Sequence, residues 1–277
     1  MIPVRVRQLP AFVKEAIKRS AILRKPGKFA QTFHLCYFSC HSYFSYLYCS
    51  LHSLTQHVKA QQYKVWLFND IDQPLSAAQI QAIEQLIPGI QVISWPKSMG
   101  WGAEQIKTIW QAYGLAAIGA KDDDIIARID SDVFFFNDTI FKAVARSDAD
   151  LIGDGHFVGF KYCQGGCYFL TVKTVRRIGQ LIDSIGMSQL MSEIDVVVED
   201  VAAHHFAKRL GLKIWLTWFM MFPDELKNSG GLTPWYRWKF SCLHFVMKNK
   251  RAMLDAYEKE IFSGKCPKEY YSIIVIS

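Results

Sequence analysis

Apolar runs of strand length alternate with segments of helical spacing through residues 29–136 of this chain. We expect strands at Phe29–Phe38, Tyr63–Phe68, Ile90–Ile93 and Asp124–Ile129, and helices at Tyr43–His57, Ser76–Leu86 and Ala103–Ala120. Alternation of this kind favours a mostly parallel central sheet flanked by helices, whose ligands bind at the carboxyl ends of the strands. The sequence therefore predicts a single α/β domain with a sizeable core.

The second half of the chain is less regular. We expect a short helix at Phe141–Ala145, strands at Asp150–Gly153, Tyr168–Val172 and Lys213–Phe219, and helices at Val175–Ile185 and Asp200–Leu210. No Gly-x-Gly-x-x-Gly motif follows the first expected strand, so a dinucleotide cofactor is not expected. The hydrophobic fraction of 51% excludes disorder, and no apolar run is long enough to span a membrane.

The net charge of +7 comes from an N-terminal arm, residues 1–28. The arm holds eight Lys or Arg residues and one acidic residue, Glu15, whereas the rest of the chain holds equal numbers of basic and acidic side chains. A helix here would carry an apolar stripe that includes Val13 and Ile17 beside its cations. Such a helix either lies on an anionic membrane surface or an acidic partner, or packs on the domain edge. Nucleic acid is not expected, because the remainder is neutral and no binding module is recognisable.

Seven cysteines show no regular pairing, which favours a reducing compartment. The N-terminus also lacks the apolar core and small-residue cleavage site of a signal peptide. We therefore expect a cytoplasmic location, and the basic arm leaves peripheral contact with the inner face of the membrane open.

One pair of aspartates, Asp130 and Asp132, follows directly on an expected strand. The Asp-x-Asp spacing occurs four times in the chain. The other three pairs lie in polar, turn-like surroundings where we expect solvated side chains; they are Asp70/Asp72, Asp122/Asp124 and Asp148/Asp150. On a strand, residues two apart point to the same side. Two carboxylates on one side repel each other unless a cation lies between them. A divalent cation that also binds a phosphate would meet this need.

Four segments, in this order, make the chain resemble a GT-A-fold glycosyltransferase that uses a nucleotide sugar. They are Asp130-Ser131-Asp132, Gln164-Gly165-Gly166-Cys167-Tyr168-Phe169, Val198-Glu199-Asp200 before an expected helix, and Cys242-Leu243-His244-Phe245. The resemblance covers roughly residues 30–250. It implies a domain at 29–250 with a nucleotide-binding half, 29–136, and an acceptor and catalytic half, 137–250. The arm and a C-terminal tail, 251–277, lie outside the pattern.

The resemblance implies a divalent metal held by Asp130, Asp132 and His244. A cation at this position would stabilise the charge of the departing nucleoside diphosphate. Asp130 alternatively contacts the ribose or a metal-bound water. An imidazole ligand favours Mn²⁺ over Mg²⁺. Taken alone, His244 would more often be a structural residue.

Asp200 is the candidate general base, and Glu199 is assigned to the catalytic group beside it. A transfer that inverts the anomeric carbon needs a carboxylate to take the proton of the acceptor hydroxyl. The start of a helix also favours negative charge, which is the structural alternative for both residues. In a retaining enzyme Asp200 would bind the donor sugar instead.

Further donor-binding residues are expected by position. Ser39 and His41 follow the first expected strand, Asn69 and Asp70 follow the second, and Ser131 lies within the aspartate motif. Gly165 and Gly166 either let the backbone approach the sugar or form an ordinary turn. Trp101, Trp215 and Trp218 either line a sugar site or belong to the core.

The predicted donor is a UDP- or GDP-linked sugar and the predicted acceptor a glycan or lipid-linked hydroxyl, as in polysaccharide biosynthesis. The rival class is a non-catalytic or degenerate module that binds nucleotide or carbohydrate. A haloacid-dehalogenase-type phosphatase is a weaker rival, because Leu151-Ile-Gly-Asp154-Gly155 lies too close to the aspartates for that family's metal motif. A sugar-nucleotide pyrophosphorylase would need a Gly-rich N-terminal loop that the sequence lacks.

Overall fold

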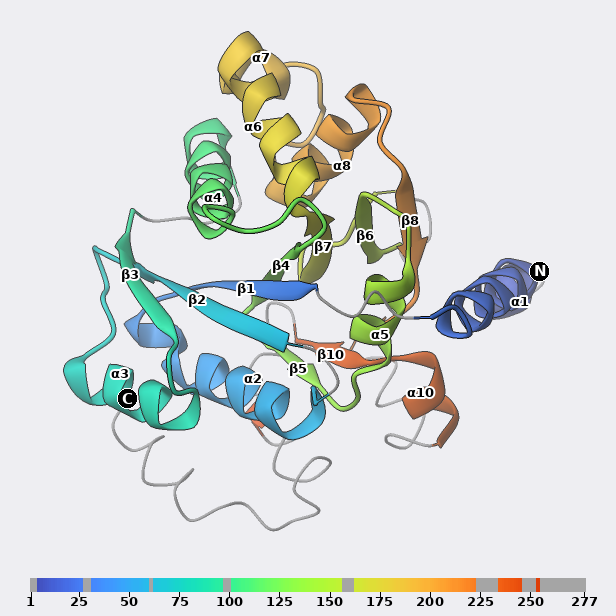
Figure 1. The fold of residues 1–277 in the computed structure, drawn as a ribbon, viewed down its shortest axis with the longest axis horizontal. Coiled ribbons are helices and arrows are strands. Elements are labelled where there is room, and N and C mark those ends of the chain that lie inside the picture. The colour runs from blue at the N-terminus through green and yellow to red at the C-terminus, as the bar shows by residue number, and fades with distance from the viewer. Residues whose placement is uncertain are drawn as a thin grey trace.

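A seven-stranded sheet forms the centre of the molecule in a computed structural model, which describes residues 4–26, 31–59, 62–96, 101–155, 162–222, 234–245 and 253–254 (Figure 1). Its strands lie in the order β3 (Gln91–Trp95), β2 (Gln62–Asp70), β1 (Thr32–Ser39), β4 (Ile125–Asp130), β7 (Cys167–Thr171), β6 (Leu151–Asp154) and β8 (Ile214–Thr217). β7 is antiparallel to both of its neighbours, β4 and β6, and the other neighbouring pairs are parallel. The predicted mostly parallel α/β sheet is confirmed.

Helices cover both faces of the sheet (Figure 1). One face packs against α2 (Phe44–His57), α3 (Ala77–Leu86) and α5 (Thr139–Arg146), and the other against α4 (Ala103–Ala116), α6 (Val172–Ile185), α7 (Met187–Met191) and α8 (Glu199–Arg209). Along β1, Phe33, Leu35 and Tyr37 enter the first core, whereas Cys36 enters the second. Because both faces are buried, the strand reads as a continuous apolar run in the sequence.

A second, three-stranded sheet consists of β5 (Val133–Phe135), β10 (Cys242–His244) and β9 (Met220–Met221). β10 is antiparallel to β5 and parallel to β9. α10 (Pro234–Lys239) precedes β10 in the chain. The sequence did not predict these strands, because runs of two or three residues carry no readable periodicity.

The expected helices form where their patterns place them. Ser76 caps α3 as expected: its hydroxyl accepts from the Gln79 backbone, and the Gln79 side chain accepts from the Ser76 N–H. The helix expected at Ala103–Ala120 ends at Ala116 instead. The turn that follows contains Gly119 with φ of 71°, a left-handed conformation that glycine adopts without strain.

The N-terminal arm forms α1 (Val4–Leu23), which packs on the domain edge. Arg19 is buried, and its guanidinium donates to the backbone carbonyls of Trp218, Trp238 and Lys239 at 2.6–3.1 Å. Ile22 joins the core next to α5. The edge-packing alternative is therefore observed, and membrane contact stays a prediction. None of the helices in the described ranges is long and apolar enough to cross a membrane.

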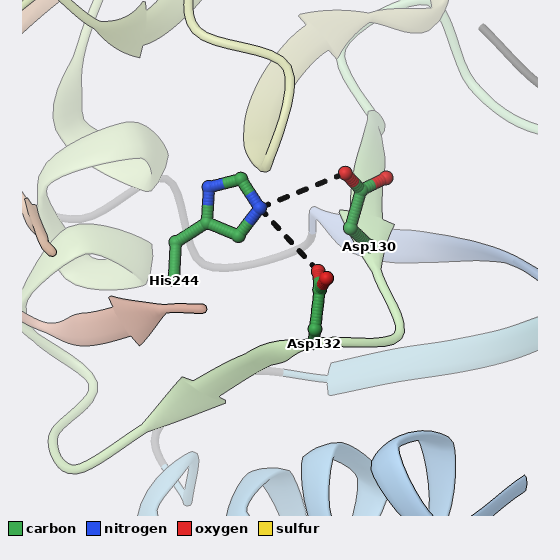
Figure 2. A group of neighbouring side chains, drawn as sticks. All are labelled: Asp130, Asp132 and His244. Carbon is green, nitrogen blue, oxygen red and sulfur yellow. Dashed lines mark ion pairs between the residues drawn. The ribbon is translucent and has the colours of Figure 1, made fainter. Parts of the chain in front are cut away.

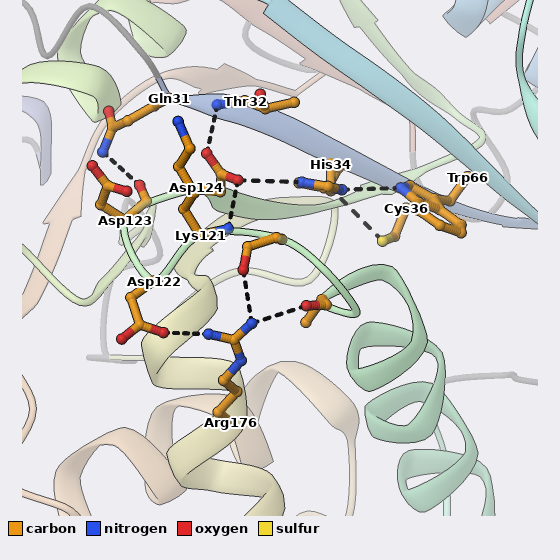
Figure 3. A network of polar contacts seen from close by, with 12 residues as sticks. Gln31, Thr32, His34, Cys36, Trp66, Lys121, Asp122, Asp123, Asp124 and Arg176 are labelled. Atoms are coloured by element: carbon orange, nitrogen blue, oxygen red, sulfur yellow. Dashed lines mark hydrogen bonds and ion pairs between the residues drawn. The ribbon is translucent and has the colours of Figure 1, made fainter.

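A polar network ties β1 to β4 at the ends opposite to their carboxyl ends (Figure 3). The Asp124 carboxylate accepts from the backbone N–H groups of Thr32 and Lys121, at 2.8 and 2.9 Å. His34 lies 3.8 Å from this carboxylate and accepts a hydrogen bond from Trp66. Our expectation that Asp124 is solvated was wrong, because its carboxylate fixes the start of β4.

Candidate functional site

A pocket of about 730 Å³ opens at the carboxyl ends of β1, β2 and β4. Parallel strands bring their carboxyl ends to one edge of the sheet, where side chains from distant parts of the sequence meet. The lining includes Ser39, Asp70, Asp130, Gly165, Asp200 and His244. Residues from all four segments of the resemblance thus share one pocket.

Asp130, Asp132 and His244 form a cluster in this pocket (Figure 2). The Nε2 atom of His244 lies 3.3 Å from an Asp132 oxygen and 3.8 Å from an Asp130 oxygen. One potential ligand atom from each residue lies within 4.8 Å of the others. This is the donor set predicted from the sequence, and the geometry suits a divalent cation with further positions open to a ligand.

Strand pairing brings His244 to the aspartates. β4 ends at Asp130, a turn follows at Ser131-Asp132, and β5 continues the chain. β10 places His244 opposite Val133, and the Phe245 N–H donates to the Asp132 carbonyl at 3.1 Å. We had expected the two aspartates to lie on the same side of one strand, but only Asp130 belongs to β4. The turn, rather than the pleat, directs both carboxylates to the imidazole.

The donor chemistry fits a metal that binds oxygen and nitrogen. Two carboxylates and one imidazole are ligands that Mn²⁺ accepts readily, and Mg²⁺ prefers oxygen alone. The ring of Phe222 lies against His244, with centroids 5.8 Å apart, and limits where the imidazole can turn. The choice between Mn²⁺ and Mg²⁺ stays a prediction.

Gly166 makes room for the imidazole. A Cβ added at Gly166 would lie 2.3 Å from Nδ1 of His244. The Gly166 carbonyl also accepts from the Asp130 N–H at 2.9 Å, which joins this loop to the aspartate motif. At Gly165, a Cβ would lie 3.1 Å from an Asp200 oxygen. The two glycines thus let the backbone approach the candidate ligand and the candidate base.

A buried arginine, Arg128, was missed at the sequence level. Its guanidinium lies 2.8 Å from Asp130 and 3.4 Å from Glu199. Burial alone would lower the Arg128 pKa, but Glu199 and Asp130 raise it well above its usual range. The signal was an Arg in an apolar strand, two residues before Asp130 and hence on the same side.

Glu199 is buried at the start of α8 within a hydrogen-bonded group. The Tyr113 hydroxyl donates to Glu199 at 3.1 Å and lies 2.9 Å from the Tyr168 hydroxyl. Burial raises the Glu199 pKa to about 8, while Arg128 opposes the shift. These contacts suit a residue that positions the start of α8.

Glu199 and Asp200 both line the pocket, and Asp200 is the more exposed of the two. Burial raises its pKa, whereas the N–H groups of Val201 and Gly165 and the charge of Arg128 lower it. A carboxylate with a raised pKa accepts a proton more effectively. Burial raises the pKa of both carboxyl groups, and the greater exposure of Asp200 makes it the one that a substrate can reach more readily.

The residues expected at the strand ends divide into two groups. Ser39, Asp70 and Ser131 line the pocket. The Ser39 hydroxyl is buried and has no hydrogen-bond partner within the described ranges. His41 and Asn69 lie outside the lining: His41 contacts Gln79 at 3.0 Å, and Asn69 accepts from the Leu75 N–H.

One of the three tryptophans lines the pocket. Trp101 is 66% exposed there, and its backbone pairs with Val198 just before Glu199. Trp215 is buried and donates to Glu15, and the Trp218 carbonyl accepts from Arg19. The last two residues belong to the contact between the domain and α1.

The phosphatase motif has a structural role. Asp154 is fully buried, and its carboxylate accepts from the backbone N–H groups of Phe219 and Met220 at 2.8 and 2.7 Å. It does not join the cluster of Asp130, Asp132 and His244. The structural role of Asp154 therefore argues against a metal motif of the haloacid-dehalogenase type at this position.

No protein-family model and no curated protein sequence matches the chain. Solved structures do match its fold. The galactosyltransferase LgtC, in complex with donor and acceptor sugar analogues, aligns with a TM-score of 0.51 and 12% identity over 87% of this chain and 99% of its own. The bifunctional glycosyltransferase WbbM aligns with a TM-score of 0.59 and 12% identity over 90% of this chain and 52% of its own. The chain therefore has the GT-A fold of these glycosyltransferases.

Proposed function

We propose that the protein is a metal-dependent glycosyltransferase that moves a sugar from a nucleoside-diphosphate sugar, UDP- or GDP-linked, to an acceptor hydroxyl. The observation that supports this most is the pocket in which Asp130, Asp132 and His244 meet Asp200 at the strand ends of a GT-A fold. Fold alone does not define chemistry, so the proposal depends on these side chains.

Asp130, Asp132 and His244 would hold the cation, and Mn²⁺ is the favoured one. When bound, the cation offsets the negative charge that develops on the departing diphosphate. Ser39, Asp70 and Ser131 supply polar groups for the nucleoside, and the backbone at Gly165 and Gly166 supplies space beside the base. His41 and Asn69, which lie outside the lining, are not carried into the proposal.

Asp200 would take the proton from the acceptor hydroxyl. The acceptor oxygen forms a bond to the anomeric carbon while the bond from that carbon to the diphosphate oxygen breaks, and the configuration inverts. Glu199 holds the start of α8 through Arg128 and Tyr113, so it positions its neighbour. In a retaining reaction Asp200 would instead bind the donor sugar, and product stereochemistry distinguishes the two.

The acceptor is a glycan or a lipid-linked hydroxyl. Exposed Trp101 at the pocket suits the apolar face of a sugar ring. The catalytic unit is residues 29–250, with arm 1–28 and tail 251–277 as additions. We place the protein in the cytoplasm, with the arm at the inner face of the membrane.

Hydrolysis of nucleotide sugars in the presence of Mn²⁺ tests the proposal. We expect release of nucleoside diphosphate by the wild type, strongly reduced release by Asp132→Ala and Asp200→Asn, and normal release by Asp72→Ala. Asp72 belongs to another Asp-x-Asp pair and is exposed outside the pocket. Circular dichroism confirms folding of each variant.

Full activity of both site variants would contradict the assignment. Binding of UDP or GDP that depends on Mn²⁺, without turnover on any acceptor, would favour the non-catalytic module.

A further inference from the structure

The helices α1 and α10 contact each other, and both carry exposed apolar and cationic side chains. Arg19 of α1 donates to backbone carbonyls of α10, and its guanidinium lies 5.7 Å from the ring centre of Trp238. Both helices lie at the same side of the molecule, on the right in Figure 1. Their exposed residues Val13, Lys14, Ile17, Trp235, Arg237 and Trp238 are named the α1–α10 surface.

Four apolar side chains of this surface are about half exposed or more. Ile17 is 65% exposed and Val13 46% exposed, one helical turn apart on α1. On α10, Trp235 and Trp238 are 56% and 48% exposed, with ring centres 5.1 Å apart. Exposed aromatic and aliphatic residues on adjacent helices mark a contact site rather than scattered surface residues.

The charge of the two helices is almost entirely positive. α1 and α10 together contain seven Lys or Arg residues and one acidic residue, Glu15. The Glu15 carboxylate accepts a hydrogen bond from Trp215 at 2.7 Å, so it is directed to the domain. Arg19 is buried, but Lys14, Lys18 and Arg237 are exposed, so the exposed cations are complementary to an anionic surface.

We propose that the α1–α10 surface binds an anionic lipid bilayer. Tryptophan rings favour the level of the lipid headgroups, and Lys and Arg reach the phosphates around them. Protein interfaces are depleted of Lys, whereas Lys14 is exposed here beside the apolar residues. The arm predicted from the sequence is thus half of the site, and α10 supplies the aromatic half. The inference extends the proposed placement of the arm at the membrane and is independent of the proposed reaction.

Flotation of the full chain with phosphatidylcholine vesicles, with and without phosphatidylglycerol, tests the proposal. We expect binding to the anionic vesicles only, weakened by salt. Lys14→Gln/Ile17→Ser should lower the partition coefficient about tenfold or more, since one cation near an anionic surface contributes about fivefold and the lost apolar contact adds to this. Trp235→Ala/Trp238→Ala should lower it by a similar factor. The matched control, Lys107→Gln/Ile118→Ser, changes an exposed cation and an exposed apolar residue elsewhere and should bind as the wild type does.

Thermal unfolding verifies that each variant is folded. Equal binding to both vesicle types, or wild-type binding by either α1–α10 variant, would overturn the proposal. Retention on heparin without vesicle binding would also overturn it, because the partner would then be a soluble polyanion.

Discussion

Gly166→Ala tests whether the glycine loop sets the position of His244. The added Cβ would lie 2.3, 2.4 and 2.7 Å from three atoms of the imidazole, whereas ordinary contacts begin at 3.4 Å. The ring must therefore move by about 1 Å, and Phe222 on the ring limits the directions open to it. A nitrogen ligand of a metal such as zinc is held at about 2.0–2.1 Å, so a shift of this size removes it from the coordination shell.

We expect the affinity for Mn²⁺ to fall by about 10–100-fold or more, the range found when groups that orient a ligand are lost. Overpacking should lower the free energy of unfolding by about 1–3 kcal/mol. Titration calorimetry of Mn²⁺ in the presence of nucleoside diphosphate measures the first quantity, and urea unfolding measures the second.

Two glycines serve as controls. Gly179→Ala, in α6, has no neighbour within 4 Å of the new Cβ, and it should raise stability by about 0.5–1 kcal/mol with Mn²⁺ affinity unchanged. Gly165→Ala approaches Asp200 at 3.1 Å, so it should lower turnover more than metal affinity. Folded Gly166→Ala with wild-type affinity for Mn²⁺ would refute the reasoning. Failure of the wild type to bind Mn²⁺ would instead refute the metal site itself.

Three further predictions concern the supporting structure. Arg128→Met removes the guanidinium beside the buried Glu199 carboxyl and should cost about 1–3 kcal/mol in urea unfolding, whereas adding Glu199→Gln should recover part of the loss; no recovery would contradict the pairing. Burial lowers the His34 pKa, so the folded chain binds a proton less readily than the unfolded chain. The contribution of His34 to stability is complete above about pH 6.5 and declines as the pH falls toward the folded-state pKa. His34→Asn should therefore reduce the dependence of the free energy of unfolding on pH below about 6.5, and the dependence that remains is due in part to His57 and His204. An unchanged pH dependence would count against this role of His34. Arg19→Ala leaves three backbone carbonyls without their donor and should lower stability by about 1–3 kcal/mol and increase proteolysis of α1; resistance equal to the wild type would argue against this docking role.

The features that the sequence predicted are local ones. Apolar runs identified the strands of the large sheet because both faces are buried, so the runs are continuous. The aspartate motif and Glu199-Asp200 were found because each lies at the junction of an apolar segment and a polar one. The cluster of Asp130, Asp132 and His244 agrees with the sequence-based ligand set.

The features that it did not predict depend on contacts between distant residues. Nothing in Gln164–Phe169 indicates that its strand is antiparallel to β4, since direction depends on the route of the preceding loop. At position 166 the imidazole of His244 leaves no space for a Cβ atom. His244 is distant in the sequence, so no local pattern indicates this contact. His41 was expected at the ligand because it follows β1, but a short 3-10 helix begins at this residue and its ring contacts Gln79.

The four Asp-x-Asp pairs differ in what their oxygens face. Asp70, Asp124 and Asp150 each accept backbone N–H groups, which close turns or fix the start of a strand. Asp130 faces Arg128 and His244, and its carboxylate shares the pocket with that of Asp132. Backbone N–H groups satisfy a carboxylate without any ligand, whereas a carboxylate beside an imidazole and a second carboxylate gains from an added cation. The surroundings of the oxygens, rather than the spacing, therefore distinguish the candidate metal site from the other three pairs.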